Sequence, residues 1–136
     1  MGVVRLLAAG AVFLVLPAGS GPAERTVVLT AHHSAFSPAR VVVEAGTAVR
    51  FVVRNEDPID HELVIGDDAT HRRHEQGREA HHHGDVAGEV SVPAGATSAT
   101  TYRFATPGRV VFGCHLPGHW DYGMRGVVVV SVTTRR

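Results

Sequence analysis

The chain has 136 residues, which is typical of a single domain, and 44% of them are hydrophobic, which is enough for one core. Its 13 basic and 13 acidic residues balance, so charge gives no support for binding to nucleic acid or to an anionic membrane. All the basic residues are arginine, and the chain also contains ten histidines and a single cysteine.

The N-terminus has the pattern of a secretory signal peptide. Arg5 gives a positive start, Leu6–Leu16 is an apolar run, and small residues follow it. We expect residues 1–20 to be the signal, with cleavage somewhere between 18 and 23. The apolar run is shorter than the ~20 residues that a membrane span needs, but an uncleaved anchor remains the alternative. We therefore expect an exported chain, periplasmic or extracellular, possibly membrane-associated, with one domain over residues 24–136.

Short apolar runs separated by turn residues predict an all-β sandwich or barrel of seven or eight strands. No helical period of about 11 residues competes with this pattern, outside one insertion. The four valines near the C-terminus predict a strand that is buried on both faces or lies centrally in its sheet. The expected strands cover residues 25–31, 40–43, 47–55, 61–65, 89–92, 97–104, 109–112 and 126–133.

Residues 67–88 form a polar, histidine-rich insertion that interrupts the strands. Residues 69–80 are expected to form a short helix, on which His71 and His74 share one face. Histidine-rich tracts can bind metals, so a second copper or zinc site competes with a simple solvated loop. A docking surface that becomes charged below about pH 6.5 is a further possibility. His81, His82 and His83 belong to the same alternatives.

A metal-ligand pattern stands out in the loop after the seventh expected strand. Cys114, His119 and Met124 follow one another with four residues between each pair, and Pro117-Gly118 supplies a bend. A thiolate, an imidazole and a thioether are soft ligands that suit copper far better than calcium or magnesium, and the thioether also disfavours zinc. A lone cysteine in an exported chain has no partner for an internal disulfide, which leaves metal binding, reactivity or burial.

His61 is the best candidate for the fourth ligand. It opens an apolar run after a polar loop, so it lies at a strand end where a rigidly held imidazole can face the cysteine loop. Two histidines, one cysteine and a distant methionine form the ligand set of electron-transfer copper sites.

The sequence resembles the cupredoxins, the family of plastocyanin and azurin, over nearly the whole of the expected mature chain. The resemblance lies in AFSPARVVVEAGTAVRFVVRN, DHELVIGD and VVFGCHLPGHWDYGMRG. It implies an eight-stranded Greek-key sandwich that binds one type 1 copper ion and transfers single electrons. His61, Cys114 and His119 would be the equatorial ligands and Met124 the weak axial one. The loop spacing is most similar to that of rusticyanin, but Glu62 stands where many members have asparagine.

The remaining candidates have simpler interpretations. His115 follows Cys114 directly, and because adjacent extended residues point apart we expect it to be a solvated loop residue. His32 and His33 are expected to be ordinary polar positions. Trp120 and Tyr122 are expected to cover the site, to offer a docking surface, or both.

The predicted function is one-electron transfer between transient protein partners, a donor and an acceptor, by a monomeric copper protein that is not an enzyme. Copper binding, storage or delivery through the histidine-rich insertion is the alternative. A multicopper oxidase is disfavoured because a trinuclear centre needs several His-x-His pairs and a histidine on both sides of the cysteine, whereas Gly113 precedes Cys114.

Overall fold

The computed structural model describes residues 24–77 and 86–133. The expected signal peptide and the triplet His81–His83 lie outside the described residues. Within the described part of the chain, none of the helices has the length and apolar character needed to cross a membrane.

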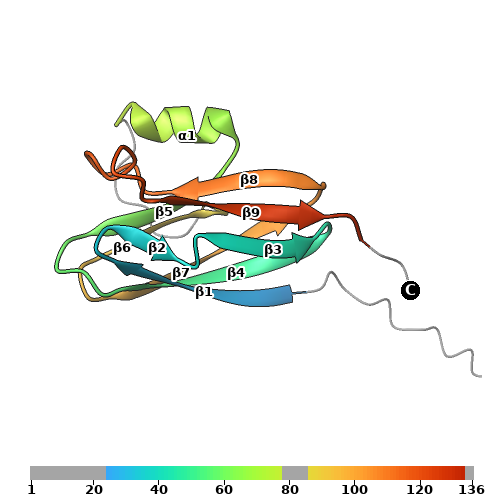
Figure 1. Ribbon diagram of the computed structural model, residues 1–136, viewed down its shortest axis with the longest axis horizontal. Coiled ribbons are helices and arrows are strands. Elements are labelled where there is room, and N and C mark those ends of the chain that lie inside the picture. Colours follow the sequence, from blue (N-terminus) through green and yellow to red (C-terminus); the bar gives the residue numbers. More distant parts are fainter. Residues whose placement is uncertain (1–23, 78–85, 134–136) are drawn as a thin grey trace, which may run out of the picture.

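Nine strands form two sheets that pack face to face (Figure 1). The four-stranded sheet has the order β2-β1-β4-β7 and the five-stranded sheet has the order β3-β9-β8-β5-β6. This arrangement confirms the predicted Greek-key β-sandwich. The strands are β1 (Glu24–His32), β2 (Ala35–Ser37), β3 (Arg40–Glu44), β4 (Thr47–Asn55), β5 (His61–Gly66), β6 (Glu89–Val92), β7 (Thr97–Phe104), β8 (Gly108–Gly113) and β9 (Arg125–Ser131).

The alternation of apolar and polar residues explains why the strands form and which face they bury. Along β4, Val49, Phe51 and Val53 are fully buried, while Arg50 and Arg54 on the alternate positions are exposed. A period of two places these side chains on opposite faces of a strand. The buried set enters a core shared by both sheets, to which each fully buried side chain of this size contributes about 1.5–3 kcal/mol.

The topology adds one strand to the prediction and shows where the valine run lies. The strand β2 was not predicted, because its three residues are too few to show a period; it is held by its pairing with β1 and by Phe36, which packs 5.8 Å from Phe112. The valine run Val127–Val130 lies in β9, between β3 and β8, so the predicted central position is correct.

In the described part of the insertion, the helix α1 (Asp68–Glu75) lies on the outer side of the five-stranded sheet (Figure 1). Asp67 caps it by accepting a hydrogen bond from the Thr70 N–H at 2.9 Å. The helix is shorter than the predicted 69–80. Gln76 is its C-terminal cap, with its N–H donating to the Arg72 carbonyl, and Gly77 then adopts a positive φ of 61°.

The sheet register brings the two predicted ligand segments to the same end of the sandwich. β5 pairs with β8 in antiparallel register, with Val64 opposite Gly113. The first residue of β5, His61, therefore lies beside the chain that leaves β8 at Cys114. The loop between β8 and β9, at the left of Figure 1, closes this end of the molecule.

Candidate metal centre

Three of the four predicted ligands converge at this end. The Nδ1 atom of His119 lies 3.2 Å from the Sγ atom of Cys114 and 3.3 Å from Nδ1 of His61. All three ligand atoms lie within 4.8 Å of one another. They come from a strand end, from the start of the loop and from its middle, so the fold places side chains that are up to 58 residues apart around one point.

Met124 closes the loop on which the other two ligands lie. Its carbonyl accepts a hydrogen bond from the Cys114 N–H at 3.0 Å, and its own N–H donates to the His119 carbonyl at 3.0 Å. The side chain is fully buried in the same core cluster as Cys114. The backbone thus ties the predicted axial residue directly to two of the predicted equatorial ones.

Asp57 orients His61, and the sequence analysis did not identify it. The Nε2 atom of His61 donates to the Asp57 carboxylate at 2.8 Å, which leaves Nδ1 as the lone-pair atom facing His119. The same carboxylate accepts the backbone N–H groups of His33 at 2.7 Å and Ser34 at 2.9 Å. A carboxylate behind a histidine is a common arrangement around protein metals because it fixes the ring and its tautomer.

Burial by itself would raise the pKa of Asp57, but these contacts outweigh it. The Ser34 N–H, the His61 ring and the His33 N–H all favour the ionised carboxylate and lower its pKa to about 2. The only signal in the sequence was an acidic residue four positions before the candidate ligand, in a cluster that also fits an ordinary turn.

Asn55 fixes the segment that carries Asp57. Its Oδ1 atom accepts the Asp57 N–H at 3.0 Å, and its Nδ2 atom donates to the carbonyls of Ile59, Val92 and Pro93 at 2.8–3.1 Å. The side chain is buried, so these bonds are shielded from competing water. The β4–β5 connection is therefore a rigid support for His61.

Cys114 is fully buried, and this burial raises the pKa of its thiol to about 11. The backbone N–H groups of Glu62 and Leu116 oppose the shift, and the negative charge of Glu62 adds to it. A bound cation reverses the preference for the neutral thiol, because metals bind cysteine as the thiolate.

His119 lies closer to the surface than the other ligands. Its side chain is half-buried between exposed positions that include Pro117, Gly118 and Tyr122, and the Tyr122 side chain is 85% exposed. Burial, and then the neighbouring His61, lower the pKa of His119, so the ring is neutral and can bind a metal at pH 7.

Glu62 joins the two ligand segments from the position where many cupredoxins have asparagine. Its Oε1 atom accepts the backbone N–H of His115 at 2.8 Å, and the side chain is buried. A tie between the strand that carries His61 and the loop that starts at Cys114 is therefore present, made by a carboxylate.

The expectation that His115 is a solvated loop residue is wrong. Its ring is half-buried, stacks on Trp120 at a centroid distance of 4.3 Å, and lies 2.9 Å from the Nδ1 atom of His71. The solvated interpretation of His71 and His74 is wrong as well, because both are buried where α1 packs on the sheet. His71 and His115 are 44 positions apart in the sequence, and local spacing cannot reveal such a contact.

The structure also bears on the predictions for His32, His33 and Trp120. His32 and His33 are exposed, as expected for ordinary polar positions. Trp120 covers the start of the loop: a side chain on Gly113 would place its Cβ atom 2.5 Å from the Trp120 ring. Glycine at position 113 is therefore what lets the indole approach the backbone beside Cys114.

The donor set fits copper. Two imidazole nitrogens and a buried sulfur, with the Met124 thioether at the end of the same loop, are the soft and intermediate donors that copper prefers over hard cations. The carboxylate on His61 and the closed backbone of the loop supply the outer contacts that hold such ligands in place. The arrangement can hold one ion and shield it from bulk water.

Comparisons with known proteins agree with the fold. A family model described as "Cupredoxin-like domain" matches residues 5–130. The "Copper-resistant cuproprotein CopI" of Rubrivivax gelatinosus is 39% identical over 118 residues, which cover 84% of this chain and 71% of that protein. The auracyanin of Roseiflexus castenholzii superposes with a TM-score of 0.65 at 19% identity, over 78% of this chain and 96% of that one. The multicopper oxidase mgLAC superposes with a TM-score of 0.61 at 17% identity, over 83% of this chain and 40% of that one. The likeness to these two solved structures shows the fold alone.

Proposed function

The chain belongs to the cupredoxin-like domain family, and from that premise we propose that it is an exported type 1 copper protein that carries single electrons between protein partners. The proposed ligands are His61, Cys114 and His119, with Met124 in the weak axial position. The observation that carries the proposal is the convergence of two Nδ1 atoms and one Sγ atom, with neighbouring separations of 3.2 and 3.3 Å.

The residues around the site have roles that suit electron transfer. Bound copper supplies the couple between Cu(I) and Cu(II). Asp57 and Asn55 hold His61 in one orientation, and the backbone bonds between Cys114, His119 and Met124 hold the loop. Ligands that are fixed in this way need to move little when the charge at the site changes, which keeps electron exchange fast.

His119 provides the route to a partner in this proposal. It is the half-buried ligand, and the surrounding loop presents the exposed Tyr122. A partner that docks here reaches the site through one imidazole ring. Interfaces of this kind are small and short-lived, in keeping with separate donor and acceptor proteins and a monomeric carrier.

An enzymatic role is not part of the proposal, because Gly113 occupies the position before Cys114 where a trinuclear centre needs histidine. Export to the periplasm or cell exterior is part of the proposal, on the strength of the signal-like N-terminus.

Redox titration of the copper-loaded protein tests the carrier role. We expect full, reversible reduction and reoxidation with one electron per copper and no loss of the ion over repeated cycles. The rate of electron exchange with a small cytochrome should fall when Tyr122 is replaced by glutamate, which places charge on the docking surface. Release of the ion on reduction would contradict the carrier proposal.

Copper handling is a second candidate function, and one specific observation favours it. The relative of 39% identity is described as a copper-resistant cuproprotein. A protein of this kind would bind exchangeable copper in addition to the buried ion. Transfer of copper to a chelator separates the two functions, whatever further ions bind elsewhere: retention of the thiolate-bound ion in both oxidation states supports the carrier, and its transfer to the chelator supports handling.

A further inference from the structure

A second pair of histidines meets beside α1, apart from the proposed copper ligands. His71 from α1 and His115 from the β8–β9 loop approach to 2.9 Å between Nδ1 and Nε2. His71 is buried and His115 is half-buried. Two imidazole nitrogens from separate segments that approach this closely are the basic element of a transition-metal site.

The hydrogen bonds define which atoms are available as ligands. The Nε2 atom of His71 lies 3.2 Å from the Val111 carbonyl, which can only accept, so Nε2 carries the proton and Nδ1 has the lone pair. A backbone carbonyl behind a histidine is an arrangement that orients metal ligands. A proton of His115 must then lie between the two rings when no metal is bound.

Metal binding in this scheme requires the proton of His115 to move from Nε2 to Nδ1. The Nδ1 atom of His115 is buried and has no hydrogen-bond partner, so no contact holds the ring in one tautomer apart from His71 itself. A tautomeric shift frees Nε2, and a cation can then take the place of the shared proton. His74 is not a ligand in this scheme, because its Nδ1 bonds to the Thr70 carbonyl at 2.9 Å and its Nε2 faces Glu89 at 3.4 Å.

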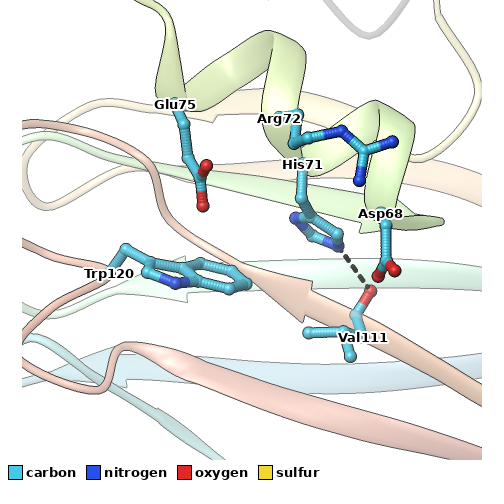
Figure 2. A pocket seen from close by; sticks show the side chains of 6 residues that line it. All are labelled: Asp68, His71, Arg72, Glu75, Val111 and Trp120. Atoms are coloured by element: carbon cyan, nitrogen blue, oxygen red, sulfur yellow. Dashed lines mark hydrogen bonds between the residues drawn. The ribbon is translucent and has the colours of Figure 1, made fainter.

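Two exposed carboxylates border the cavity beside His71. Figure 2 shows the His71 ring pointing from the helix toward β8, with the carboxylates of Glu75 and Asp68 on opposite sides of it. The Arg72 guanidinium at the rim is exposed to solvent. The cavity has a volume of about 200 Å³ and is lined by Asp68, His71, Arg72, Glu75, Val111 and Trp120.

We propose that Nδ1 of His71 and Nε2 of His115 bind a second metal ion of the Cu(II) class, with water or the exposed Glu75 side chain completing its coordination. Metal–nitrogen bonds of about 2.0–2.1 Å and a nitrogen separation of 2.9 Å correspond to an angle of about 90° at the metal. That angle suits two neighbouring ligands of tetragonal Cu(II) better than the wider angle of tetrahedral zinc. The two proposed sites would share consecutive residues, Cys114 and His115, but they are separate in ligands and in spectroscopic type.

Stepwise addition of Cu(II) to the metal-free protein at pH 7.4 tests the proposal by EPR. The second equivalent should give a signal with a large copper hyperfine splitting and nitrogen couplings from two imidazoles, without a new thiolate band. The variants His71→Gln and His115→Gln should each weaken binding of this second ion by at least about tenfold. The thiolate-to-copper band of the first ion reports in the same samples whether the variants are folded.

Two control variants locate the second ion. His32→Gln changes an exposed histidine away from the pair and should alter the affinity by less than about twofold. The triple variant His81→Gln, His82→Gln, His83→Gln should retain the two-imidazole signal. Loss of that signal in the triple variant, or its persistence in folded His71→Gln or His115→Gln protein, would overturn the proposal. If the first ion gives no thiolate band, the proposed carrier function fails, while the signal of the second ion still decides this site.

Discussion

Replacement of Asp57 by asparagine tests how the protein holds His61. Asparagine keeps the size of the side chain but has only one oxygen to accept the bonds that His33, Ser34 and His61 donate to the carboxylate. One or more of these buried donors loses its partner. The variant should therefore be less stable at neutral pH and should hold the His61 ring less firmly.

The size of the effect follows from the pKa of Asp57. A decrease from the ordinary value of 3.8 to about 2 corresponds to about 2 kcal/mol, at 1.36 kcal/mol for each pKa unit. The folded-state pKa lies below the unfolded value, so this contribution is fully present above about pH 4. It is lost as the pH falls through about 2.

Urea denaturation of the metal-free protein, followed by the fluorescence of Trp120, measures the effect. Trp120 is the single tryptophan of the chain, so the signal reports on the loop beside the site. The difference in free energy of unfolding between wild type and Asp57→Asn should be about 2 kcal/mol at pH 6 and should shrink toward zero near pH 2. Glu56→Gln removes a charge from the same connection at an exposed position and should cost less than about 0.5 kcal/mol. The same pH dependence in wild type and Asp57→Asn would refute the reasoning.

Three further predictions concern the loop and its supports. Glu62→Gln keeps an oxygen to accept the His115 N–H but removes a buried negative charge near Cys114. Voltammetry of the copper-loaded protein should therefore show a reduction potential higher by tens of millivolts, and an unchanged or lower potential would contradict this role of Glu62. In the metal-free protein the Cys114 pKa of about 11, compared with an ordinary 9.0, predicts a thiolate fraction about a hundredfold lower than that of an exposed cysteine. Alkylation by iodoacetamide at pH 8 should be correspondingly slow, with urea-unfolded protein as the control. Gly113→Ala would place a Cβ atom 2.5 Å from the Trp120 ring, so thermal unfolding should show a loss of about 1–3 kcal/mol and a shifted Trp120 emission; unchanged emission would mean that the indole does not pack there.

Local pattern was sufficient to predict every described strand except β2 and to select the ligand candidates. The alternation along β4 reproduced its bounds, and the spacing of Cys114, His119 and Met124 identified a loop whose ends the backbone ties together. His61 was selected from its place at a strand end, and the register of β5 with β8 explains why a strand end is the relevant position.

The parts that were missed depend on contacts between distant segments. Asp57 acts by accepting N–H groups from the turn after β1, more than 20 residues earlier, and no local period encodes that meeting. His71 and His115 come together only because α1 packs on the sheet above the cysteine loop. Each looks like an ordinary polar position when its own segment is considered alone.

The most direct test of the metal centre is the visible and EPR spectrum of the mature protein after one equivalent of Cu(II) is added. Convergence of His61, Cys114 and His119 predicts an intense thiolate-to-copper absorption band that disappears in Cys114→Ser. It also predicts that the band is lost or strongly altered in His61→Gln, whereas His32→Gln leaves it unchanged. A colourless complex in the wild type, or a band that survives removal of His61 without change, would contradict the account.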